Sequence, residues 1–107
     1  MRYILFVIHN LTKLASDDEM EKIGAFNKKL KDLGYWIAAE GIAHSSEALL
    51  IDNRHGIGQV EKGSVFDSPD FYNGFWLLEV PSKDVAKAIA LEASEACNRR
   101  VELRPYL

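Results

Sequence analysis

The sequence has few of the features that would place it outside the class of soluble globular domains. It holds a single cysteine, Cys97, so no disulfide can form within the chain, and we expect a reducing, cytoplasmic environment. The opening apolar run, residues 3–8, is far shorter than the roughly 20 apolar residues of a membrane-spanning helix. No small-residue cleavage site follows it, which argues against a signal peptide. We therefore expect no membrane partner.

An excess of positive charge is also missing. Lys and Arg number 13 against 16 Asp and Glu, which gives a net charge of −3. Proteins that bind duplex nucleic acid or anionic membranes normally show the opposite balance, so we expect no nucleic-acid partner. No internal repeat or low-complexity segment is present. The 107 residues, 48% of them hydrophobic, predict one globular domain over residues 1–107 with a modest core.

The first half of the chain predicts a buried strand followed by a helix. Residues 2–9 are nearly all β-branched, aromatic or leucine, as in a strand covered on both faces. Ser16 and Glu19 form a capping box, in which Ser16 accepts from the Glu19 amide and the Glu19 side chain reaches back to the cap. Gly34 is the expected residue after the helix end. The apolar stripe of this helix consists of Met20, Ile23, Phe26, Leu30 and Leu33.

The remainder alternates short apolar runs with turn residues. We expect a strand over 35–43, with Gly41 marking a bulge or a close approach, and a short strand over 48–52. Residues 63–67 are expected to return as the hairpin partner of that short strand, with 57–62 as a loop. The last expected elements are a strand over 72–80, a helix capped by Ser82 with its stripe at Val85, Ile89, Ala93 and Ala96, and a strand over 101–104.

The order β-α-β-(hairpin)-β-α-β predicts an α+β protein of the ferredoxin-like plan, with a hairpin inserted at about residues 48–67. Its two right-handed crossovers place both helices on one face of an antiparallel sheet. Both sets of alternating side chains in the first strand are apolar, so the other sheet face also needs cover. A homodimer that pairs sheet against sheet provides that cover.

Several short motifs, in this order, resemble the YCII-related family and specifically its DGPF-like branch. They are Phe26-Asn27 with Leu30 and Gly34, Ala39-Glu40-Gly41-Ile42-Ala43, Gly74-Phe75-Trp76 and Val101-Glu102-Leu103-Arg104-Pro105. The resemblance covers nearly the whole chain. It implies a ferredoxin-like protomer in a dimeric α/β barrel. Most members of the family are uncharacterised, and some resemble lyases or dehalogenases that act on ring compounds.

The chain departs from the family at two places. Where the DGPF-like branch carries Asp-Gly-Pro-Phe and a Glu- and Lys-rich segment, this chain has Asp67-Ser68-Pro69-Asp70, and the charged segment is essentially deleted. The other branch pairs a helix histidine with an aspartate. Asp32 matches that aspartate, but Ile23 occupies the histidine position. The resemblance alone therefore supports Asp32 as a substrate contact.

The expected topology gathers polar residues at one end of the sheet. The first and second core strands run in the same direction, so His9 and His44 lie at the same end, where the third core strand begins. Asp67, Asp70 and Tyr72 are expected nearby. An imidazole beside a carboxylate supports acid–base chemistry near neutral pH. We expect His44 as the acid or base, Asp67 as its catalytic partner, and substrate contacts from His9, Asp70 and Tyr72.

Other readings of these residues stay open. The same polar residues occur at strand ends that simply meet water, and the chain then acts as a non-catalytic ligand-binding or partner domain. The three histidines, His9, His44 and His55, lack the close spacing of a structural zinc site, so we expect neither a metal nor a cofactor. Cys97 in an alanine-rich segment is typical of a small buried hydrophobe. RNA binding through Gly74-Phe75-Trp76 is the third alternative, and the acidic charge opposes it.

Overall fold

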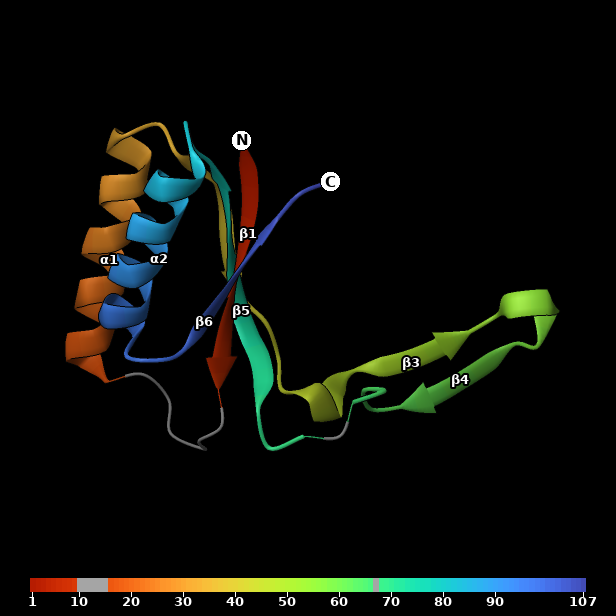
Figure 1. The fold of residues 1–107 in the computed structure, drawn as a ribbon. Coiled ribbons are helices and arrows are strands. Elements are labelled where there is room, and N and C mark those ends of the chain that lie inside the picture. The colour runs from red at the N-terminus through yellow and green to blue at the C-terminus, as the bar shows by residue number, and fades with distance from the viewer. Residues whose placement is uncertain (10–15, 67) are drawn as a thin grey trace.

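The structure of the protein is a computed structural model, and it describes residues 1–9, 16–66 and 68–107. Within that part of the chain, a four-stranded sheet has the order β2-β5-β1-β6, and two helices cover one of its faces (Figure 1). The sheet strands are β1 (Arg2–His9), β2 (Trp36–Gly41), β5 (Phe71–Glu79) and β6 (Val101–Pro105). The helices are α1 (Asp17–Asp32) and α2 (Lys83–Cys97).

Every neighbouring pair of strands in this sheet is antiparallel. β1 lies between β5 and β6, and each crossover through a helix therefore skips one strand, as in a split β-α-β unit. The expected α+β class and the antiparallel sheet with two helices are confirmed. The arrangement is compatible with the ferredoxin-like fold.

Helix α1 begins and ends as its sequence predicts. The Ser16 hydroxyl accepts a hydrogen bond from the Glu19 amide at 3.2 Å. At the other end Gly34 has φ +76°, and the Tyr35 amide donates to the carbonyl of Leu30 at 2.9 Å, which is the Schellman pattern. One detail of the prediction is wrong: the Glu19 carboxylate does not return to the cap but pairs with Arg99.

The core lies between the helices and one face of the sheet. Alternate residues of β1 are buried there because successive strand side chains point to opposite faces. Phe26 and Leu30 fill the centre from α1, and Phe26 meets Trp76 edge to face with ring centroids 5.4 Å apart. Met20 and Leu33, at the two ends of the expected stripe, remain 58% and 47% exposed. Fewer residues of α1 are therefore buried than its apolar periodicity predicted.

Helix α2 packs through its smallest residues. The Ser82 hydroxyl caps it by accepting from the Val85 amide, as expected. The buried positions of α2 are Ala86, Ile89, Ala93 and Cys97. The buried face of the helix is therefore rotated slightly from the predicted one, and Val85 and Ala96 lie at its edge. Cys97 is a buried small side chain, as its setting predicted, and burial raises the pKa of its thiol. Asn98 ends the helix in the left-handed conformation.

The inserted hairpin is present, but its return strand differs from the prediction. It consists of β3 (Leu49–Asp52) and β4 (Gln59–Lys62), whereas residues 63–66 are not strand. The pairing of Ile51 with Val60 places them on one exposed face. β4 has a single apolar residue, Val60, and buries none of its side chains, so its sequence resembles a loop.

The hairpin projects away from the sheet on the side opposite the helices (Figure 1). We call it the arm, residues 49–62. The chain has a radius of gyration of 15.8 Å, while a compact domain of this length has roughly 13 Å. The short 3-10 turn Ser45–Glu47 precedes the arm, and the short 3-10 turn Arg54–Gly56 forms its tip.

The irregularities of the sheet also lie away from the expected position, Gly41. In β2 the register shifts between Trp36 and Ala38, and a β-carbon at Gly41 would make only an ordinary contact. The close approach belongs instead to Gly74, where a β-carbon would lie 3.1 Å from the carbonyl oxygen of Glu40. A second register shift, between Val7 and Ile8, leaves Asn73 as the extra residue of β5.

The contrast between Leu30 and Leu33 gives a test of this core. Leu30 is fully buried, so replacing it by alanine leaves a cavity and should lower the free energy of unfolding by about 2–5 kcal/mol. The matched change Leu33→Ala, in an exposed side chain three residues away, should cost no more than about 1 kcal/mol. Urea unfolding followed by circular dichroism measures both. Equal losses would contradict the packing described here.

Candidate functional site

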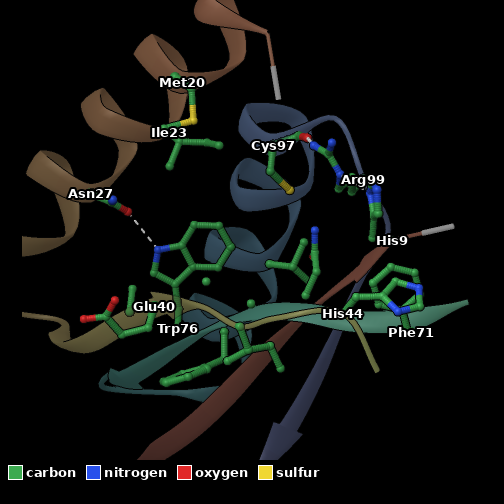
Figure 2. A pocket seen from close by; sticks show the side chains of 17 residues that line it. His9, Met20, Ile23, Asn27, Glu40, His44, Phe71, Trp76, Cys97 and Arg99 are labelled. Carbon is green, nitrogen blue, oxygen red and sulfur yellow. Dashed lines mark hydrogen bonds between the residues drawn. The ribbon is translucent and has the colours of Figure 1, made fainter. Parts of the chain in front are cut away.

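A cavity of about 890 Å³ lies between the first half of α1 and the sheet (Figure 2). Its lining comes from β1, α1, β2 and the segment after it, β5, and the end of α2. The lining residues are Val7, His9, Met20, Ile23, Asn27, Ala39, Glu40, Gly41, Ile42, His44, Phe71, Asn73, Gly74, Phe75, Trp76, Cys97 and Arg99.

The cavity exists because two of the sheet residues beneath this part of α1 are glycines. Gly41 and Gly74 are paired across β2 and β5, and Ala39 lies next to them. A side chain at Gly74 would press on the neighbouring backbone, so the strands approach closely and nothing fills the space above them. Met20 and Ile23 of α1 face this space, and Ile23 also packs against the edge of the core. The exposure of Met20 is a consequence of the cavity.

One end of the cavity is polar and carries two histidines. Figure 2 shows His9, His44 and Phe71 together at this end of the cavity. The ring centroids lie 5.5 Å apart for His9 and Phe71, and 4.4 Å apart for His44 and Phe71. The expectation that the ends of β1 and β2 bring the two imidazoles together is therefore met by the geometry.

His9 is buried and is held by a cation. Its Nδ1 accepts a hydrogen bond from Nε of Arg99 at 2.9 Å. Burial, the positive charge of Arg99 and the nearby His44 lower the pKa of His9 below its ordinary value. A guanidinium can only donate, so the neutral His9 ring carries its proton on Nε2. His9 is thus a hydrogen-bond donor toward any ligand.

Arg99 joins the polar end of the cavity to the start of α1. Its Nη1 lies 3.3 Å from the carboxylate of Glu19 and donates to the carbonyl of Cys97 at 2.7 Å. The side chains of Arg99 and Glu19 are only 15% and 23% exposed. Several partly buried hydrogen bonds therefore fix the guanidinium beside His9.

His44 is positioned by the turn that follows β2. It caps the short turn Ser45–Glu47, and its Nδ1 accepts from the Ser46 amide at 2.9 Å. The Ser46 hydroxyl lies 3.0 Å from the same nitrogen. In the neutral ring the proton is again on Nε2, and the ring is exposed at the mouth of the cavity.

The other end of the cavity is aromatic and largely apolar. The indole of Trp76 lies on the floor, and its N–H donates to Oδ1 of Asn27 at 2.8 Å. Because that bond satisfies the only polar atom of the ring, Trp76 offers a ligand its carbon surface. Ile23 and Met20 of α1 lie opposite it (Figure 2).

The remaining residues predicted for the site lie elsewhere. Asp70 forms an ion pair with Arg100 at 2.9 Å. Tyr72 stacks on Phe6 with centroids 4.3 Å apart, and its hydroxyl donates to Glu102, on the sheet face without helices. Asp32 pairs with Lys28 at the far end of α1. None of the three lines the cavity, and their roles as substrate contacts stay predictions. Asp67 lies outside the described residues.

Sequence reasoning missed Arg99, Asn27 and Trp76. Trp76 and Asn27 lie within the motifs that carry the family resemblance, yet their mutual hydrogen bond joins elements that are 49 positions apart in the chain. Arg99 follows the left-handed Asn98, which turns the chain at the end of α2. The adjacent basic pair, Arg99 and Arg100, was the available signal.

Within the described residues, no group of three or more His, Cys, Asp or Glu side chains is placed to hold a metal ion. In the same residues, no helix has the length and apolar character required to cross a membrane.

The chain matches the model of a known protein family. No curated protein matched the chain in a sequence search. The model of the YCII-related domain matches residues 1–106, which is almost the full length. The chain therefore belongs to the YCII-related family.

Proposed function

We propose that the protein binds a small ring compound in the cavity beneath α1 and acts on it through His44. The observation that carries this proposal is the combination of an aromatic, apolar end with two imidazoles at the opposite end. Small-molecule sites have this composition: mostly apolar walls and a few convergent polar groups. The volume of about 890 Å³ also lies in the usual range for such sites, roughly 300–1,000 Å³.

The arrangement of His44 favours hydrogen-bond donation over proton abstraction. Its Nδ1 is engaged with Ser46, so the accessible nitrogen, Nε2, carries the proton in the neutral ring. A neutral imidazole at this position suits lyase- or dehalogenase-like chemistry on a ring, because its Nε2–H can stabilise a leaving group or a developing oxyanion by a hydrogen bond. Asp67, which precedes β5 in the sequence, remains the proposed charge partner of His44.

Non-catalytic binding is the second candidate function. His9 favours it, because the ring that Arg99 holds in the neutral form is suited to orient a ligand and not to exchange protons. Turnover of a bound compound distinguishes the two candidates. Binding without turnover would assign the site to ligand recognition.

Trp76 provides a direct readout of binding. In a Trp36→Phe background Trp76 is the single tryptophan, and a ring compound that enters the cavity should change its fluorescence. Against a library of small ring acids and phenols, His44→Asn should weaken binding by about tenfold, since it retains an acceptor for Ser46 but removes the Nε2–H donor. Titration of fluorescence against ligand concentration measures the affinity.

His55 supplies the matched control for that experiment. It lies at the tip of the arm, outside the cavity, with φ 56°, a conformation that asparagine tolerates. His55→Asn should leave the affinity unchanged. Equal weakening by both variants, or a library without a single binder, would refute the proposed function.

We also propose that two copies pair through the sheet face without helices, as in the dimeric α/β barrel of the DGPF-like branch. Figure 1 shows both helices on the same side of the sheet, which leaves the opposite face open. Much of that face is apolar, and an apolar area of this kind is typical of a protein interface. Its half-buried side chains include Ile4, Phe6, Ile8, Phe75 and Leu77.

Light scattering coupled to gel filtration tests the dimer. The wild-type protein should elute with twice the chain mass at micromolar concentration. Leu77→Glu, at the centre of the open face, should give a monomer because it places an unpaired charge in the interface. Leu91→Glu, at an exposed position on α2, should remain dimeric. A monomeric wild type, or dissociation of both variants, would contradict the proposed interface.

A further inference from the structure

We infer that the cavity selects ligands that present a hydrogen-bond acceptor, above all a carboxylate, and that Arg99 is the positioning residue that prepares His9 to receive it. The inference rests on the proposed function, because it assumes that the cavity binds a small molecule. It adds the chemical class of the ligand head group, and it assigns to Arg99, which also lines the cavity, the role of positioning His9.

The first step concerns His9. Every nitrogen of the Arg99 guanidinium is a donor, so the Nδ1 that receives its N–H must hold a free lone pair. A neutral imidazole has one protonated nitrogen, which must then be Nε2. Within the described residues, the hydrogen bond of the His9 ring is the one from Arg99, and the ring lines the cavity. His9 therefore presents an N–H and no lone pair to a ligand.

The second step concerns His44, which reaches the same state by a different route. Its Nδ1 accepts from the backbone amide of Ser46, a group that can only donate. The nitrogen that remains for a ligand is again a protonated Nε2. The two rings contact the same side chain, Phe71, so their donors lie at one end of one cavity.

The charges around the two rings favour an anion over a cation. Arg99 is positive and contacts His9 directly, and the carboxylate of Glu19 faces Arg99 on its α1 side. The thiol of Cys97 is held protonated by burial and adds no negative charge. The carboxylate of Glu40 is at the opposite, aromatic end (Figure 2). A ligand cation at the histidine end would meet two N–H donors and a guanidinium.

The state of the histidines can be measured without any ligand. Nitrogen-15 spectra of the imidazoles should show His9 and His44 with the proton on Nε2 at pH 7.5, and His55, on the arm, serves as the internal reference. Arg99→Met should release His9, which then populates both tautomers and titrates nearer to pH 6.5, its ordinary value. Arg99→Lys, which restores a donor, should return His9 to the Nε2–H form.

A wild-type His9 or His44 with its proton on Nδ1 would overturn the inference, and this measurement needs no variant to fold. An unchanged His9 in a folded Arg99→Met protein would overturn the role of Arg99. Because a merely structural arginine would alter stability and leave the tautomer as it is, the spectrum separates the two roles.

The ligand class is tested with two probes of equal size, benzoate and benzylammonium. In the Trp36→Phe protein, benzoate should bind at least about tenfold more tightly than benzylammonium, and Arg99→Met should reduce that ratio. Equal affinities, or a preference for the cation, would overturn the ligand class while leaving the proposed function intact. If no ring compound in the wider library binds, the proposed function itself fails, whatever the state of the histidines.

Discussion

The close approach of β5 to β2 at Gly74 is the constraint on which the cavity depends. With 3.1 Å between a hypothetical β-carbon and the carbonyl oxygen of Glu40, the site accepts no larger residue without movement of the backbone. The paired glycines add no side chain to the floor of the cavity, and α1 spans the gap because Phe26 and Leu30 anchor its second half in the core. The same helix is thus a core element at one end and a cavity wall at the other.

Arg99 completes the site by joining segments that are distant in sequence. It contacts His9 at the end of β1, Glu19 in the first turn of α1 and the carbonyl of Cys97 at the end of α2. These groups belong to three elements that meet only in the folded state. The geometry of His9 is therefore a property of the tertiary structure, and a change in either crossover would alter it.

The sequence was sufficient for the elements whose signals are local. The Ser16 and Ser82 caps, Gly34 and the apolar alternation of β1 each depend on a few neighbouring residues, and each appears as predicted. The return strand of the arm was missed because β4 buries no side chain and so carries no hydrophobic signal.

In the candidate site, too, some features could be predicted from the sequence and others could not. His9 and His44 could be paired from topology alone, since two strands that run in the same direction end at the same edge. Which face of the strand a residue occupies was harder to predict. The register shift at Val7 and Ile8 reverses the alternation of β5, so Tyr72 lies on the open face while Phe71 lines the cavity. Partners such as Glu19 with Arg99 depend on the distance between helix ends, which no local pattern encodes.

The hydrogen bond between Trp76 and Asn27 has a consequence for recognition. Since the indole N–H is already engaged, the Trp76 ring itself cannot distinguish ligands by their polar substituents. Against this ring, two compounds with the same head group are separated only by the thickness and outline of their rings. The histidines and Trp76 thus supply chemical and steric selectivity at opposite ends of the same cavity.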